Sequence, residues 1–247
     1  MSILVTGGTK GLGRATALRF AAPGVDVFIN YHRDKTAAAK TAAEIEEKGA
    51  AAHLVEADIG TVEGARGAVA AVADVTDQLD QLVHCAVDTS VRGALLDMDP
   101  YRYAQALQCN GSALLPLVQA ALPLFRRGSS VIFVTSRGSQ IAVPGYGAVG
   151  PPKLLGEALV TYLAVELAPR GVRVNSVSAS TLDTEALRSV LSEERALRWL
   201  ERAAEKNPSG RRVELSEVVD AIEFLCSPQA VMIQGQRLNV DGGFYLR

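Results

Sequence analysis

A run of glycines near the start of the chain has the spacing of a phosphate-binding loop. The segment Thr6-Gly7-Gly8-Thr9-Lys10-Gly11-Leu12-Gly13 follows a short apolar run and opens a helical pattern. Glycines let the backbone turn tightly and approach a pyrophosphate, whose charge is favoured at a helix N-terminus. A glycine pattern alone could be a flexible turn, but the strand, turn and helix context predicts a dinucleotide site. Its expected contacts are Gly7, Thr9, Lys10, Gly11, Leu12 and Gly13.

The residues after the second apolar run bear on which dinucleotide binds. A site that prefers NAD usually carries Asp or Glu there, to bind the ribose 2′-hydroxyl. Here the segment reads Asn30-Tyr31-His32-Arg33, while Lys10 and Arg33 supply positive charge for a 2′-phosphate. We therefore expect NADPH as the cofactor. The alternative is that both bases are simply solvated. The further expected contacts from this segment are Tyr31, His32 and Arg33.

These motifs need a framework of alternating strands and helices to position them. The expected strands are Ile3–Thr6, Val25–Asn30, Ala52–Glu56, Gln81–Cys85, Ser130–Thr135, Arg173–Ser178 and Arg237–Val240. The expected helices are Leu12–Ala22, Lys35–Lys48, Val62–Val75, Tyr101–Phe125, Lys153–Ala168 and Glu217–Cys226. Near-continuous apolar strands that alternate with helices are typical of a parallel sheet covered on both faces. Residues 1–247 are therefore expected to form one α/β domain, a doubly wound Rossmann-type sheet of about seven strands.

One segment, residues 182–212, breaks this alternation. It carries two helical patterns, Thr184–Leu191 and Glu193–Lys206, and ends in Asn207-Pro208-Ser209-Gly210. Because the segment follows a strand, it lies beyond a carboxyl edge of the sheet, where open α/β sheets bind ligands. We expect it to be a substrate lid, and a surface insertion is the alternative.

Composition excludes several classes of protein. Of the 247 residues, 48% are hydrophobic and 21% are charged, with a net charge of −2, so disorder is excluded and nucleic acid is a poor partner. The longest apolar stretch, Ser112–Phe125, is too short for a membrane span, and the first residues do not resemble a secretory signal. Three cysteines without zinc-ligand spacing fit a reducing compartment. We expect a cytoplasmic protein without a metal. The cysteines are Cys85, Cys109 and Cys226.

Motifs along the whole chain resemble those of the short-chain dehydrogenase/reductase superfamily. The glycine spacing is followed in order by Ala57-Asp58-Ile59, Asn110, Val131–Ser136, Arg173-Val174-Asn175 and Asp241-Gly242-Gly243. The resemblance implies that Asp58 contacts the adenine and that Ile59 is its apolar neighbour. It also implies cofactor contacts at four other positions, which are Ala86, Val87, Leu182 and Thr184.

The catalytic residues that the resemblance implies depart from the usual superfamily pattern, Ser-x12-Tyr-x3-Lys. Ser136 and Lys153 are in register, but Val149 stands in place of the tyrosine. Tyr146 lies three residues earlier, and its Tyr-x6-Lys spacing resembles that of NADPH-dependent enoyl-acyl-carrier-protein reductases. On a helix, residue i+7 lies about 20° from residue i, so Tyr146 and Lys153 would share one face.

The resemblance implies a role for each of these side chains. The phenol of Tyr146 would stabilise an enolate oxygen, and Lys153 would hold the nicotinamide ribose. Ser136 and Asn110 would order the phenol, the helix and nearby water. An ordinary loop aromatic is the alternative for Tyr146.

Three departures weaken this transfer of roles. The usual Asn-Asn-Ala-Gly is His84-Cys85-Ala86-Val87 here, and the usual Pro-Gly before the lid is Ala179-Ser180. Most serious is Gly150-Pro151-Pro152, because two prolines in a second helical turn would lose two backbone hydrogen bonds. The simpler expectation is a helix that begins near Gly150, which would leave Tyr146 on a loop flanked by glycines.

The leading functional hypothesis is reduction of the double bond of an enoyl thioester by NADPH, with the acyl group bound to acyl carrier protein or CoA. The alternatives are a short-chain carbonyl (keto) reductase and a cofactor-binding protein without turnover. Arginines and glutamates along Glu193–Lys206 could dock an acidic carrier protein, although a solvated helix with mixed i,i+4 charges explains them more simply. The apolar excess in Tyr101–Phe125 and Lys153–Ala168 predicts a homotetramer, with a dimer as the alternative.

Overall fold

The computed structural model describes residues 1–190 and 193–246, and a parallel sheet forms its centre. Within these residues the sheet has seven strands in the order β3-β2-β1-β4-β5-β6-β7, which confirms the predicted doubly wound Rossmann-type fold. The chain moves outward from β1 to β3 and then returns to the other side of β1. The switch point between β1 and β4 is where such folds bind ligands. The strands are β1 (Ser2–Thr6), β2 (Asp26–Tyr31), β3 (Ala51–Glu56), β4 (Gln81–His84), β5 (Ser130–Ser136), β6 (Arg173–Ala179) and β7 (Arg237–Val240).

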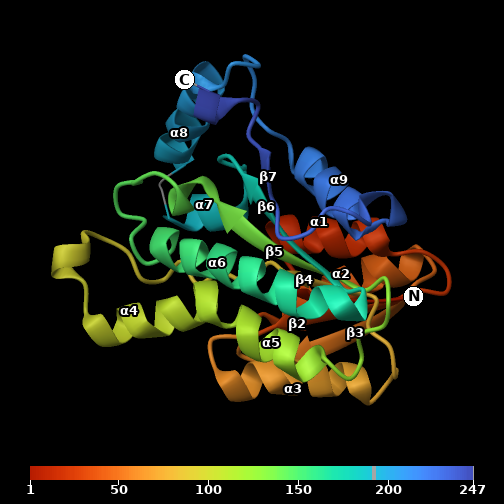
Figure 1. Ribbon diagram of the computed structural model, residues 1–247. Coiled ribbons are helices and arrows are strands. Elements are labelled where there is room, and N and C mark those ends of the chain that lie inside the picture. The colour runs from red at the N-terminus through yellow and green to blue at the C-terminus, as the bar shows by residue number, and fades with distance from the viewer. Residues whose placement is uncertain (191–192, 247) are drawn as a thin grey trace.

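Helices cover both faces of the sheet (Figure 1). One face packs against α1, α2 and α9, and the other against α3, α5 and α6. Because both faces are covered, the central strands are apolar throughout rather than alternating. The helices are α1 (Gly11–Phe20), α2 (Lys35–Glu47), α3 (Val62–Ala73), α4 (Pro100–Leu107), α5 (Leu114–Ala121), α6 (Gly150–Leu167), α7 (Glu185–Val190), α8 (Glu193–Lys206) and α9 (Leu215–Cys226).

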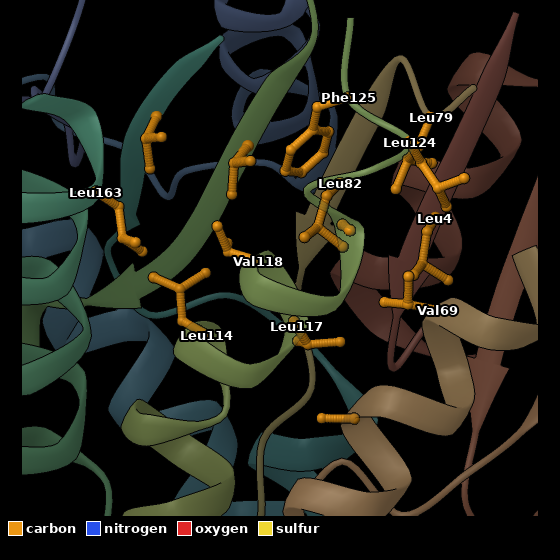
Figure 2. Close-up of a cluster of buried hydrophobic side chains, with 14 of the residues drawn as sticks. Leu4, Val69, Leu79, Leu82, Leu114, Leu117, Val118, Leu124, Phe125 and Leu163 are labelled. Carbon is orange, nitrogen blue, oxygen red and sulfur yellow. The ribbon is translucent and has the colours of Figure 1, made fainter. Parts of the chain in front are cut away.

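The larger core cluster fills the layer between the sheet and the helices α3, α5 and α6 (Figure 2). Leu82 of β4 and Phe133 of β5 are fully buried there, against Leu114 and Leu117 of α5. Each such side chain contributes about 1.5–3 kcal/mol to stability when it is buried. This layer fixes the central strands, and thereby the carboxyl edge at which their loops meet.

The predicted single helix Tyr101–Phe125 is wrong. The chain forms α4 and then a π-helical turn over Gln108–Ser112, after which α5 begins. Gly111 explains why the turn needs a small residue, since a Cβ there would lie 2.2 Å from the carbonyl oxygen of Pro152. The close approach of this turn to the start of α6 therefore interrupts the helix, as single π-turns often do near functional sites.

The start of α6 follows the expectation drawn from its two prolines. The helix begins at Gly150, and the prolines occupy its first turn, where their missing N–H groups cost nothing. Lys153 is therefore one turn inside the helix and Tyr146 precedes it on a loop. The predicted sharing of one helical face by Tyr146 and Lys153 is thus wrong, because Tyr146 is not helical.

The segment 182–212 holds α7 and α8, which Figure 1 draws at the same end of the molecule as the C-terminus. Helix α8 buries Ala196, Leu200 and Ala203 and exposes its charged side chains. Its Arg198 pairs with Glu194 at 2.7 Å on the same helix. Of the predicted helix Thr184–Leu191, Leu191 lies outside the described residues. Among the residues that the structure describes, no helix is long and apolar enough to span a membrane.

Candidate functional site

The glycine loop between β1 and α1 is shaped by contacts that admit no side chain. Gly7 and Gly11 have φ values of +62° and +49°, in the left-handed region that favours glycine. A Cβ on Gly7 would lie 2.9 Å from the Cα of Ala86, and one on Gly13 would lie 2.2 Å from the carbonyl oxygen of Gly7. Lys10, the N-cap of α1, makes no side-chain capping bond, so the first backbone N–H groups of the helix face the loop. This cradle fits a pyrophosphate.

Asn30 holds the glycine loop against the ends of β2 and β3. Its side-chain oxygen accepts a hydrogen bond from the N–H of Gly7 at 3.3 Å. Its amide nitrogen donates to the carbonyls of Val55 and Ala57, at 3.2 and 3.0 Å. Thr41 of α2 also donates to the carbonyl of Thr9, at 3.2 Å. The loop is therefore fixed from two sides by hydrogen bonds that the glycine pattern alone does not reveal.

The residues expected beside the adenosine gather at the ends of β2 and β3. His32 Nε2 lies 3.7 Å from Oδ2 of Asp58, and Oδ1 of Asp58 accepts from the N–H of Gly60 at 2.9 Å. Ile59 is buried behind them, and Arg33 is exposed at the same edge. The structure thus brings the β2 and β3 candidates together.

Tyr31 and Lys10 each meet carboxylates at this end of the site. The hydroxyl of Tyr31 donates to Glu56 at 3.3 Å. The ammonium of Lys10 lies 2.6 Å from Asp34 and 3.3 Å from Glu185. The hydrogen bond that the Lys10 ammonium donates to Asp34 raises the pKa of Lys10, and the same contact lowers the pKa of the Asp34 carboxyl. The sequence reasoning missed both carboxylates around Lys10.

The remaining cofactor candidates lie next to the glycine loop. The N–H of Ala86 donates to Oγ1 of Thr6 at 3.2 Å, and Val87 follows it with a partly exposed side chain. Leu182 packs against the core cluster that lies between the sheet and the helices α1, α2 and α9. A Cβ on Gly11 would lie 3.5 Å from the methyl of Thr184, so the start of the 182–212 segment touches the loop.

His84 at the end of β4 is a core residue, as expected. Its Nδ1 lies 2.6 Å from Oγ1 of Thr6, and its ring packs at 5.6 Å from Phe133. Burial, and then the charge of Lys153, lower its pKa to about 3. The imidazole is therefore neutral at physiological pH.

Asn110 lies in the π-helical turn and joins three segments through a fully buried side chain. Its amide nitrogen donates to the carbonyls of Asp88 and Ala148, both at 2.9 Å, and its oxygen accepts from the N–H of Asp88 at 2.6 Å. These bonds tie the loop after β4 to the loop before α6. Asn110 thus positions the loop that carries Tyr146.

Ser136 and Tyr146 lie close together at the end of β5. The hydroxyl of Ser136 accepts a hydrogen bond from the N–H of Gly138 at 3.1 Å, and Gly138 packs against the ring of Tyr146. Burial raises the pKa of Tyr146, while the neighbouring Ser136 hydroxyl and the charge of Arg137 act in the opposite direction. The guanidinium of Arg137 lies 4.4 Å from the ring centre of Phe244, near the end of the chain.

The loop around Tyr146 is held by close packing rather than by a helix. A Cβ on Gly138 would lie 2.6 Å from Cδ1 of the Tyr146 ring, so the ring packs against the turn after β5. The backbone of Tyr146 pairs with that of Gly93, and its carbonyl accepts from the N–H of Gly150 at 2.8 Å. A Cβ on Gly147 would lie 2.6 Å from the Leu95 side chain. Neither Gly138 nor Gly93 stood out in the sequence.

Lys153 is buried at the first turn of α6. Its Nζ lies 4.6 Å from the ring centre of Phe133. Burial lowers the pKa of Lys153 to about 8, against weaker opposite effects of Cys109, Cys85 and Glu157. Burial also raises the pKa of Cys85 to about 12 and that of Cys109 to about 11, so both remain thiols.

Glu157, one turn after Lys153, fixes α6 to the sheet. Its carboxylate accepts hydrogen bonds from Thr135 at 2.5 Å and from Ser139 at 2.6 Å, and pairs with Arg237 of β7 at 3.1 Å. The pair is largely buried, and removal of one partner from such a pair typically costs about 3–5 kcal/mol. This network was also missed in the sequence, because its members come from four separate segments.

Comparison with known proteins agrees with this geometry. Residues 7–245 match the family model described as enoyl-(acyl carrier protein) reductase. The chain is 33% identical over 240 residues to the 1-cyclohexenylcarbonyl-CoA reductase of Streptomyces collinus, covering 97% of this chain and 85% of the relative. It is 31% identical to the 3-oxoacyl-[acyl-carrier-protein] reductase of a Synechocystis species, covering 98% of this chain and 96% of the relative.

Solved structures extend the likeness to the whole fold. The crystal structure of a short-chain dehydrogenase from Burkholderia cenocepacia in complex with NADP has a TM-score of 0.88 and 28% identity, and the match covers 98% of this chain and 97% of that one. The chain therefore belongs to the enoyl-(acyl carrier protein) reductase family of the short-chain dehydrogenase/reductase superfamily, and it is an oxidoreductase.

Proposed function

We propose that this protein reduces the carbon–carbon double bond of an enoyl thioester with NADPH. The observation that carries the proposal is the position of Tyr146 beside Ser136 and Gly138 at the end of β5, with Lys153 on the adjoining helix. The usual tyrosine position is taken by Val149, which is 2% exposed and cannot donate a proton. Tyr146 is thus the phenol available in the proposed site.

When bound, the reduced nicotinamide supplies the hydride that adds to the β-carbon. The phenol of Tyr146 would donate a hydrogen bond to the thioester oxygen, where negative charge develops, and the resulting enolate would take a proton from water at its α-carbon to give the saturated thioester. Ser136 would help to position that phenol. The ammonium of Lys153 would bind the ribose hydroxyls, and its positive charge would favour the charged oxygen nearby.

The name of one relative supports double-bond reduction. The Streptomyces protein is called a reductase of an acyl-CoA whose ring double bond is conjugated to the thioester. A substrate of this chemical class would need an oxyanion donor at the carbonyl and hydride delivery two bonds away. An acyl group on CoA or on acyl carrier protein would present the same reacting atoms.

A carbonyl reductase is the second candidate. The Synechocystis relative is named for 3-oxoacyl reduction. The loop position of Tyr146 also favours this candidate. The Tyr-x6-Lys spacing indicates double-bond reduction only if Tyr146 and Lys153 share one helical face, and Tyr146 is not helical. In that reaction the phenol of Tyr146 would give its proton to the alkoxide oxygen.

The cofactor is NADPH, which the glycine cradle and the adjacent bases fit. Lys10 and Arg33 lie at the carboxyl ends of β1 and β2, and a structural neighbour holds NADP. Neutralising a 2′-phosphate there would favour NADPH over NADH by at least tenfold, or about 1.4 kcal/mol. Fluorescence titration with the two cofactors tests this, and equal affinities would contradict it.

We further propose that residues 182–212 act as a lid over the substrate in a one-domain protein. Support comes from the contact of Thr184 with the glycine loop at the near end of the segment. At its far end, the buried Asn207 meets Gly242 in the loop after β7. The lid would exclude water from the reacting carbons.

Product identity decides between the two reactions. The protein is mixed with NADPH and one of three substrates, an enoyl thioester, a 3-oxoacyl thioester or a conjugated enone, and the products are identified by mass spectrometry and NMR. We expect saturation of the enoyl thioester and 1,4-reduction of the enone. Exclusive 1,2-reduction would establish the carbonyl reductase. Tight NADPH binding without turnover on any substrate would contradict both.

A further inference from the structure

Lys10 is the meeting point of three elements of the cofactor site. Its ammonium lies between Asp34, the N-cap of α2, at 2.6 Å and Glu185, the first residue of α7, at 3.3 Å. One ammonium thus pairs with two carboxylates. The same ammonium is the group expected to neutralise a 2′-phosphate, so a dianionic phosphate that approaches it meets two carboxylates that already pair with it.

Lys10 and Glu185 line a groove of about 220 Å³ between the glycine loop, α2 and α7. The bases Arg14 and Lys40 share its wall with Lys10, and Glu185 is the carboxylate among its lining residues. Arg14 is paired with Glu44 of α2. The neighbour of Glu185, Thr184, touches Gly11 of the loop. Glu185 is therefore the contribution of the 182–212 segment to a surface that is otherwise basic.

We propose that Glu185 determines the affinity for NADPH by competing with the 2′-phosphate for Lys10. The two carboxylates differ in how firmly they are held. Asp34 is also tied to its own helix, because Oδ1 accepts from the N–H of Ala37 at 2.9 Å. Glu185 makes the longer contact and its side chain is 71% exposed, so it is the partner that a phosphate displaces. NADH, which lacks the phosphate, leaves the pair of Lys10 and Glu185 intact.

Displacement of Glu185 also releases one contact between the 182–212 segment and the glycine loop. Because Glu185 begins α7, a cofactor with a 2′-phosphate would remove the ion pair between the start of this segment and Lys10, whereas NADH would not. The inference rests on NADPH as the cofactor and not on the reaction that follows.

The test is a cofactor titration at low salt without substrate, in which the fluorescence of the reduced nucleotide measures binding. Glu185→Gln should tighten NADPH binding about three- to fivefold, the scale of one exposed ion pair, and Glu185→Lys should tighten it further. NADH affinity should change less than twofold in the Gln variant. The control is Glu194→Gln, which removes a carboxylate that pairs within α8 and should change neither affinity.

A double-mutant cycle with Lys10→Ala separates competition for Lys10 from a general effect of charge. In the Lys10→Ala protein, Glu185→Gln should no longer tighten NADPH binding. An unchanged or weaker NADPH affinity in Glu185→Gln, an equal gain for NADH, or a gain that persists without Lys10 would overturn the proposal. These measurements involve no turnover, so their outcome does not depend on whether the protein reduces an enoyl or a carbonyl substrate.

Discussion

Gly138 provides a direct test of how the phenol of Tyr146 is positioned. In Gly138→Ala the added Cβ would lie 2.6 Å from Cδ1 and 2.8 Å from Cε1 of the Tyr146 ring. Carbon atoms in contact need about 3.5–4.0 Å, so the ring must move by about 1 Å. Such a shift would move the phenol away from its position beside Ser136.

The cost follows from that displacement. A misplacement of about 1 Å at a reacting group can reduce turnover by about 10². We therefore expect kcat of Gly138→Ala to fall by about 10², with little change in KM and in NADPH affinity. Stopped-flow or steady-state NADPH oxidation with the best substrate measures kcat, and cofactor titration measures binding.

Gly67→Ala is a matched control for the glycine replacement. Gly67 lies in α3, and among the described residues a Cβ there would meet nothing within 4 Å apart from its chain neighbours and the nearby backbone of its own helix, so alanine should be neutral or slightly stabilising. Combining Gly138→Ala with Tyr146→Phe should cost little more than Tyr146→Phe alone, because both act on the same hydroxyl. Wild-type kcat in a folded Gly138→Ala protein would refute the positioning argument.

The remaining expectations concern the phenol, the buried lysine and assembly. Tyr146→Phe should lower kcat by about 10²–10³ and leave NADPH affinity nearly unchanged, which kinetics and titration will check. Because burial holds the pKa of Lys153 near 8, its ammonium is lost as the pH rises through 8, and NADPH affinity should fall over that range unless Lys153 is replaced by alanine. In the unfolded chain Lys153 stays protonated up to a pH of about 10.5, so its contribution to the free energy of unfolding rises between pH 8 and 10.5. Denaturation of the wild type and of Lys153→Met at several pH values would show this rise. Tyr162 and Val165 of α6 are over 70% exposed, and we expect a homotetramer; sedimentation as a 26.1 kDa species at micromolar concentration would contradict it.

The framework of the site was predictable because hard steric rules leave a mark in the sequence. Gly7 and Gly13 must be glycine where the loop folds back on itself, and the spacing revealed the loop. The apolar runs gave all seven strands within a residue or two, since parallel strands buried on both faces are continuous in hydrophobicity. Pro151 and Pro152 indicated the true start of α6, because proline is tolerated only in a first turn.

What could not be predicted depends on contacts between distant segments. Glu185 reaches Lys10 across 175 residues of chain, and nothing local to either residue indicates the pair. The break at Gly111 is set by the carbonyl of Pro152, which belongs to another helix. Asp34 was also missed but could have been found, because an Asp just before a helix is a common N-cap and its place near the glycine loop follows from the fold.

The position of Tyr146 on a loop changes how its role should be understood. Val149 is 2% exposed, so a tyrosine at 149 would have to enlarge a filled space. The proposed donor must therefore come from a position other than 149. The loop is nevertheless ordered, since its backbone is bonded at both Gly93 and Gly150 and its ring rests on Gly138. A phenol that is fixed in this way need not reorganise as charge develops on the substrate oxygen, which is the property that an oxyanion donor requires.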